Sequence, residues 1–152
     1  MVIELPWIGA LESFKTINTE NPIEEIWHLI DFFTSEETIS TCDPPVDRDL
    51  IPYICESITQ AQEFRLSASS CGEHTKPLLT YYSMHNLTKA VLALETNSRS
   101  AGYHGLKHVE VPSDDSFIGV SAKVNGGVFS DLLLFKGFSP NRNLKVDEFV
   151  KT

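Results

Sequence analysis

The residues best suited to chemistry gather in one short stretch of the sequence, between positions 99 and 108. This stretch brings together a planar cation, a phenol, an amine, two imidazoles and two glycines, at Arg99, Gly102, Tyr103, His104, Gly105, Lys107 and His108. A guanidinium binds oxyanions through paired N–H groups, and an imidazole exchanges protons near neutral pH. If the chain is an enzyme, we therefore expect its catalytic groups in this stretch.

The same stretch also has a structural interpretation, which needs fewer assumptions. Gly102 and Gly105 supply the backbone freedom for a turn from a helix into extended chain, and His104 can bond a helix end. Residues 97–108 would then form a glycine/histidine loop that has no activity of its own.

A metal site is a third alternative, built from His104, His108 and an acid such as Glu110. Two histidines four positions apart share a face only on a helix, whereas Gly105 and the pattern after it indicate extended chain. The sequence also lacks the P-loop, G-x-G-x-x-G and G-x-S-x-G motifs. We therefore expect neither a bound metal nor a cofactor.

The elements that must position this stretch begin with an apolar segment, Leu78 to Leu94, which predicts the central helix of the fold. Most of its residues are apolar and none is Pro or Gly, so we expect a helix buried on most of its circumference. Four residues, Ser83, Asn86, Ala90 and Ala93, form a stripe of small or polar groups that lets another helix approach closely. A buried Asn86 needs a partner, because an unpaired buried amide costs roughly 1 to 3 kcal/mol.

Two earlier segments predict helices that pack around the central one. Asn21 can cap the first helix, whose apolar residues recur at helical spacing as far as Phe33. A loop from residue 36 to 46 follows, and Asp49 is expected to cap a second helix that runs to about Ala68. The Ser/Gly-rich connection after it is short, which predicts an antiparallel hairpin with the central helix.

Beyond the loop, the pattern changes from helical to extended. Residues 107–111 and 117–124 alternate with period two around a turn, which predicts a β-hairpin. Residues 128–135 are apolar throughout most of their length and fit either a short helix or a third strand, and residues 137–143 predict a loop. The fold class is therefore α+β and mainly helical, an antiparallel helical bundle around a buried central helix followed by a β-hairpin.

The bulk composition favours a single domain. Its 152 residues, 41% hydrophobic and 22% charged, suffice for one hydrophobic core. We expect an N-terminal arm at 1–20, a helical core at 21–96, the loop at 97–108, the hairpin and short element at 109–135, and a tail at 136–152.

The composition also favours a cytoplasmic location. The three cysteines form no C-x-x-C pair, so neither a disulfide framework nor a zinc finger is indicated. The N-terminal residues have no basic region, and no apolar run of about 18 residues occurs, so we expect neither export nor membrane spanning. A net charge of -9 opposes non-specific binding to nucleic acid or anionic membranes.

Several stretches, taken in order, resemble the bacterial YaaC-like protein family. They are IEEIWHLIDFFTSEE, QAQEFRLSASS, KPLLTYYSMHNLTKAVLAL, GYHGLKHVEV and NGGVFSDLL, over residues 23–135. The run PLLTYYSMHNLTKAVLAL is the most specific. Members of the family are longer, so the resemblance implies an N-terminal part or a short relative, with a tail that continues in longer proteins. It implies no particular activity.

The stretch from Arg99 to His104 is also similar to the R-x4-H motif of the HEPN ribonucleases, helical-bundle proteins common in toxins and antiviral defence. In those enzymes the two residues cleave RNA without metal, usually in a site that a second subunit completes. The resemblance implies that Arg99 holds phosphate oxygens and that His104 moves the 2′-hydroxyl proton. Further binding residues would be Tyr103, Lys107, His108 and Asn86. The sequence departs from the motif's usual pattern at Ser100 and Gly102.

Two hypotheses follow from these features. The first is a non-catalytic structural or interaction subunit of a larger assembly, as a homo-oligomer or with a partner protein, and connected with defence. The second is a HEPN-like, metal-independent ribonuclease or toxin that uses Arg99 and His104. RNA is an expected partner only under the second hypothesis.

Overall fold

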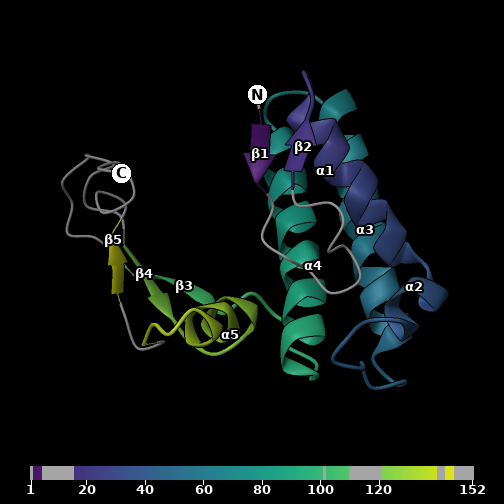
Figure 1. The fold of residues 1–152 in the computed structure, drawn as a ribbon. Coiled ribbons are helices and arrows are strands. Elements are labelled where there is room, and N and C mark those ends of the chain that lie inside the picture. The colour runs from purple at the N-terminus through teal and green to yellow at the C-terminus, as the bar shows by residue number, and fades with distance from the viewer. Residues whose placement is uncertain (1, 5–15, 101, 110–120, 140–142, 146–152) are drawn as a thin grey trace. The chain divides into compact units, whose positions relative to one another are not determined.

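A computed structural model describes residues 2–4, 16–100, 102–109, 121–139 and 143–145 (Figure 1). Contacts within the chain separate it into two compact units, residues 1–99 and residues 100–152. The single domain that the composition favours therefore stays a prediction. The boundary between the two units lies between Arg99 and Ser100, inside the stretch from 99 to 108 where catalytic groups were expected.

The first unit begins with a small sheet and continues with helices. Strand β1 (Val2–Glu4) pairs antiparallel with β2 (Thr16–Asn18), with Ile3 opposite Ile17. The helices are α1 (Pro22–Asp31), the 3-10 turn η2 (Phe32–Thr34), α2 (Glu36–Ser40), α3 (Ile51–Ser70) and α4 (Lys76–Thr96). The first helix begins where the sequence predicts, with proline in the first turn, where a missing N–H costs little. Asn21 occupies the N-cap position, but its side chain makes no capping hydrogen bond.

Two boundaries in this unit differ from the prediction. Residues 36–40 form helix α2 instead of a loop, and a helix of five residues is too short to show helical periodicity. Helix α3 has Leu50 as its N-cap, so Asp49 does not cap it. The Asp49 amide instead donates to Oδ1 of Asp47 at 3.4 Å, and the Leu50 amide donates to the Asp47 carbonyl at 2.9 Å, which makes a turn before the helix.

Helices α3 and α4 pack closely side by side, as the short connection predicts (Figure 1). All four residues of the predicted stripe on α4 are buried. The Ser83 hydroxyl donates to the Ala61 carbonyl of α3 at 2.7 Å, so the two backbones come close where the side chains are small. The hydrophobic core lies beside this contact and consists of Phe33, Ile39, Leu50, Ile51, Ile54, Ile58, Ala90 and Ala93.

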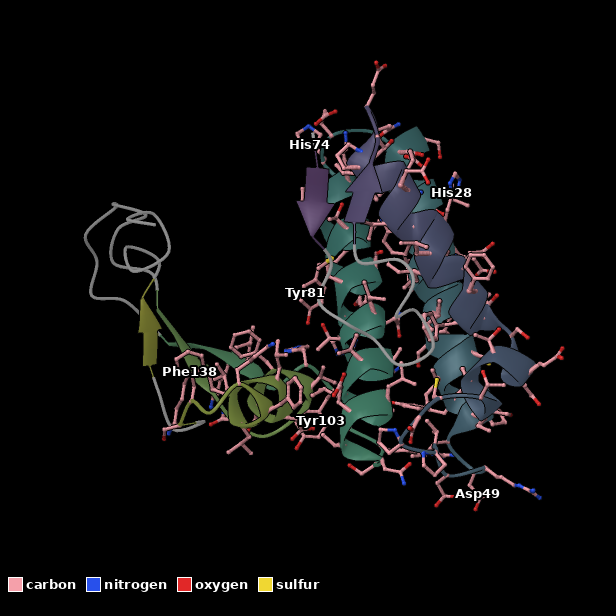
Figure 2. All side chains as sticks on the ribbon, in the orientation of Figure 1. His28, Asp49, His74, Tyr81, Tyr103 and Phe138 are labelled. Atoms are coloured by element: carbon pink, nitrogen blue, oxygen red, sulfur yellow. The ribbon has the colours of Figure 1, made fainter. Side chains whose placement is uncertain are left out.

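The prediction that the central helix is buried on most of its circumference is wrong. Leu78, Met84 and Val91 are 54%, 55% and 39% exposed, and Tyr81 projects from α4 in Figure 2. Apolar composition indicates a helix but does not say which of its sides another element covers.

The second unit contains a three-stranded sheet and one helix. Strand β3 (Leu106–Val109) pairs antiparallel with β4 (Ser121–Val124), and β4 pairs antiparallel with β5 (Asn143–Lys145). Helix α5 (Val128–Phe135) resolves the ambiguity at 128–135 in favour of a helix. Strand β5 begins inside the segment predicted as a loop, because three residues are too few to show alternation. Residues 110–120, with part of the predicted hairpin, lie outside the described residues.

Taken together, the structure confirms an α+β, mainly helical fold with a helical bundle and a β-hairpin. Within the described residues, none of the helices has the length and apolar character needed to cross a membrane.

Candidate functional site

Arg99 is held at the end of the first unit by contacts with the beginning of α3. Its Nη2 donates to the backbone carbonyl of Asp49 at 2.9 Å, and its guanidinium carbon lies 5.4 Å from the centre of the Tyr53 ring. The side chain is exposed and forms no ion pair with a carboxylate among the described residues. Figure 2 marks Asp49 at this end of the unit.

A second cation, Lys89 of α4, lies against the same tyrosine. Its Nζ is 5.4 Å from the centre of the Tyr53 ring and 3.0 Å from Oδ1 of Asn86. Asn86 is only 5% exposed, and its Nδ2 donates to the Tyr82 carbonyl at 3.1 Å. The predicted need of Asn86 for a partner is therefore met at both ends of its amide.

These contacts form a cluster of Tyr53, Asn86, Lys89 and Arg99, which we call the Tyr53 cluster. The C-cap residue of α4, Asn97, accepts the Asp47 amide through Oδ1 at 2.8 Å, which joins the end of α4 to the segment before α3. The sequence singled out Arg99 and Asn86 but not Tyr53 or Lys89. No local pattern marks Tyr53, because the packing of α3 against α4 brings it to these cations. Lys89 follows Asn86 by three positions on a helix, and this spacing was the available signal.

The part of the glycine/histidine loop that follows Arg99 belongs to the second unit, where its backbone binds the start of α5. The Tyr103 carbonyl accepts the Val128 amide at 3.0 Å, and the His104 carbonyl accepts the Phe129 amide at 3.1 Å. Because the first amides of a helix have no acceptor within the helix, such carbonyls take the place of a side-chain cap. Gly127, the N-cap residue, has no side chain to do so.

Two glycines allow the loop to approach the turn at 125–127 this closely. Gly105 has φ of +82°, and a Cβ added to it would lie 1.6 Å from the Gly126 carbonyl oxygen. A Cβ on Gly127, at φ of +89°, would lie 2.5 Å from the Tyr103 carbonyl oxygen. The Gly105 carbonyl accepts the Asn125 amide at 2.7 Å across this contact. Gly102, by contrast, has open space around it, so its predicted role in the turn is not required by the structure.

The side chain of His104 also takes part in the loop. Its Nδ1 accepts the Leu106 amide at 3.0 Å, which fits an imidazole that carries its proton on Nε2. Tyr103 is exposed and lies beside α5 (Figure 2). Arg99 belongs to the first unit and His104 to the second, so their pairing in one site stays a prediction.

The two remaining predicted binding residues lie on β3. Lys107 is exposed and directly opposite Lys123 of the central strand β4, so one face of the sheet carries two lysines on neighbouring strands. The backbone of His108 lies opposite Ala122. Glu110, the acid of the alternative metal site, falls outside the described residues. Among the described residues, no three His, Cys, Asp or Glu side chains gather closely enough to hold a metal ion.

Two cysteines of the first unit, Cys42 and Cys55, are poor candidates for thiol chemistry. Burial raises the pKa of Cys42, and burial together with the Glu36 carboxylate raises the pKa of Cys55. Both groups are therefore neutral thiols near pH 7, and the neutral thiol is a poor nucleophile.

The fold and these contacts define a small α+β protein with a helical hairpin and a separate glycine-rich strand–helix unit. The model of the YaaC-like protein family matches residues 47–151, and the chain belongs to that family. Comparison with curated proteins finds no match, and comparison with solved structures finds none either.

Proposed function

We propose that this YaaC-like chain is a non-catalytic structural or interaction subunit of a larger assembly. The supporting observation is that the fold already uses the residues considered for catalysis. Arg99 binds the Asp49 carbonyl, while His104 binds the Leu106 amide through its ring and the Phe129 amide through its carbonyl. These contacts give each residue a structural role that needs no substrate.

A side of α4 supports the interaction role. Tyr81, Met84 and Val91 are three and seven positions apart, so they share one side of the helix. The stripe that faces α3 occupies the other side, and the three apolar side chains remain exposed. This surface suits a second copy of the chain or another protein.

The three free thiols suit the cytoplasm, where disulfides are rare.

The first experiment measures association by analytical ultracentrifugation of the full chain. We expect a concentration-dependent oligomer that Met84→Glu or Val91→Glu converts to monomer, because each variant places a charge on the apolar side of α4. Thr59→Glu is the matched control, because this exposed position lies on α3, which packs against the opposite side of α4. A wild-type chain that stays monomeric, or variants that associate normally, would contradict self-association through this side.

The alternative is a HEPN-like, metal-independent ribonuclease or toxin that uses Arg99 and His104. Two observations favour it: Arg99 and His104 are both exposed, and Arg99 has no carboxylate partner among the described residues. General acid–base help from one imidazole contributes a factor of roughly 10² to 10⁴ in rate.

RNA cleavage in excess chelator distinguishes the two functions. The structural proposal predicts no cleavage of single-stranded RNA by the wild-type chain, and a loss of about 1 kcal/mol of unfolding free energy in His104→Ala, because the Leu106 amide loses its acceptor. Metal-independent cleavage that both Arg99→Ala and His104→Ala abolish, at the wild-type melting temperature, would overturn it.

A further inference from the structure

The Tyr53 cluster concentrates positive charge on a strongly acidic chain. The Nζ of Lys89 and the guanidinium carbon of Arg99 each lie 5.4 Å from the centre of the Tyr53 ring, although the chain has a net charge of -9. Two other cations of this unit lie beside carboxylates, Arg65 with Glu24 and Lys76 with Glu73. Neither Lys89 nor Arg99 has such a partner within the described part of the chain.

Both cations are held in place by neutral groups. The buried Asn86 amide orients the Lys89 ammonium, and the Asp49 carbonyl orients the Arg99 guanidinium. An ammonium has three N–H donors and a guanidinium has five, and each cation uses one of them in these hydrogen bonds. The remaining donors are therefore already positioned for an external acceptor, and less side-chain entropy is lost on binding.

We infer that Tyr53, Lys89 and Arg99 form a binding site for a phosphate group, either inorganic phosphate or the terminal phosphate of a small molecule. Two fixed positive charges match the charge of -1.5 to -2 that a phosphate monoester carries near pH 7, whereas a carboxylate carries only one. The first turn of α3 contains no acidic residue, and Asp47 and Asp49, which precede it, form no ion pair with Lys89 or Arg99. The helix dipole of α3 adds positive potential at this end of the helix. Most of the chain's negative charge is screened beyond about 8 Å at physiological salt.

This inference does not depend on the proposed function, because a phosphate site is compatible with either an interaction subunit or an enzyme. It also lies within the first unit alone and needs no residue of the second unit.

A nuclear magnetic resonance titration of the full chain tests the site, with the Tyr53 ring and Arg99 Nε signals as reporters. The ligands are inorganic phosphate and adenosine monophosphate, which separate a free anion from a phosphoryl group on a larger molecule, with acetate as the singly charged comparison. We expect saturable shifts of both reporters with at least one phosphate ligand, and weaker binding of acetate.

Variants then assign the effect to the cluster. We expect Lys89→Gln and Arg99→Gln each to weaken phosphate binding about tenfold, because each removes a charge-assisted hydrogen bond. Lys89→Arg should retain phosphate binding, because it keeps the positive charge. This variant therefore distinguishes the loss of the charge from an effect of the substitution on folding. Arg48→Gln is the matched control, since it removes the same charge from an exposed arginine near the start of α3. Absence of saturable shifts, or an equal loss in Arg48→Gln, would overturn the inference.

Discussion

The two units of this chain achieve close backbone contact in different ways. In the first, small side chains on α4 let α3 approach, and Ser83 bonds the Ala61 carbonyl across the contact. In the second, glycines with positive φ let residues 103–105 approach 125–129, and the contact is made by backbone groups. The helical contact depends on the volume of several side chains, whereas the loop contact depends on the absence of a single Cβ.

This difference predicts how each unit responds to substitution. A helix interface can relax around an added methyl group, because neighbouring side chains have other rotamers. The Gly126 carbonyl at 1.6 Å from a new Cβ cannot move aside without shifting the backbone of the turn at 125–127, which the hydrogen bond from the Asn125 amide to the Gly105 carbonyl holds in place. We therefore expect a single added methyl group to destabilise the second unit more than the first.

The largest effect is expected for Gly105→Ala. The new methyl group would meet the Gly126 carbonyl, and alanine would also have to adopt φ of +82°. We expect a loss of about 3 kcal/mol or more in the stability of the second unit, seen as loss of the α5 and β3 amide signals in a heteronuclear correlation spectrum. Gly102→Ala, where nothing lies within 4 Å, should leave these signals unchanged. Equal effects at the two glycines would contradict the described contact.

A smaller effect is expected for Ala90→Leu in the helix contact. Ala90 is 1% exposed and faces α3, so leucine would overfill the interface and cost about 1 to 3 kcal/mol in urea unfolding. The neighbouring Val91→Leu, on the exposed side, should change the free energy of unfolding by less than about 0.5 kcal/mol. A tolerated Ala90→Leu would mean that the helices are not closely packed there.

Removing the Ser83 hydroxyl should cost less again. Ser83→Ala deletes the 2.7 Å hydrogen bond to the Ala61 carbonyl while keeping the small volume, so we expect a loss of about 1 kcal/mol. Ser69→Ala is the matched control, because its hydroxyl bonds the Leu66 carbonyl in an exposed position of α3. A Ser83→Ala variant as stable as this control would show that the hydrogen bond between the helices adds nothing.

The smallest effect is a pH dependence in the first unit. Folding raises the pKa of Cys42 and Cys55, mainly through burial, above the ordinary value of 9.0. When the pH rises above 9.0, the unfolded chain loses these thiol protons before the folded chain does. The free energy of unfolding therefore has its full value below pH 9.0 and falls as the pH rises further. Urea unfolding at pH values from about 8 to about 10 should show this decline. In a Cys42→Ser/Cys55→Ser variant the free energy of unfolding should decline less steeply with pH. An unchanged slope would contradict the claim that these two thiols cause the decline.

The sequence predicted those features that a local pattern encodes. The spacing of Ser83, Asn86, Ala90 and Ala93 indicated the side of α4 that faces α3, and alternation indicated the pairing of β3 with β4. These features depend on residues close together in the chain, where helix and strand periodicity apply. The short elements α2 and β5 carry too few residues for such a pattern.

The parts that the sequence could not predict arise from distant contacts. Nothing in the residues around Tyr53 indicates that Lys89 and Arg99 will reach its ring. The residues Asn-Gly-Gly at 125–127 are typical of a turn, but nothing in them indicates that these glycines lie against Gly105. The candidate site was therefore recognised by residue type, while its structural surroundings came from tertiary packing.

Amide hydrogen exchange at Val128 and Phe129 tests most directly the claim that the glycine/histidine loop is a structural connector. The first amides of a helix normally exchange readily, because they have no acceptor within the helix. Here the Tyr103 and His104 carbonyls accept them, so we predict that both exchange as slowly as amides inside α5 and that Gly105→Ala removes this protection. Exchange at the rate of an unstructured peptide in the wild-type chain would contradict the claim.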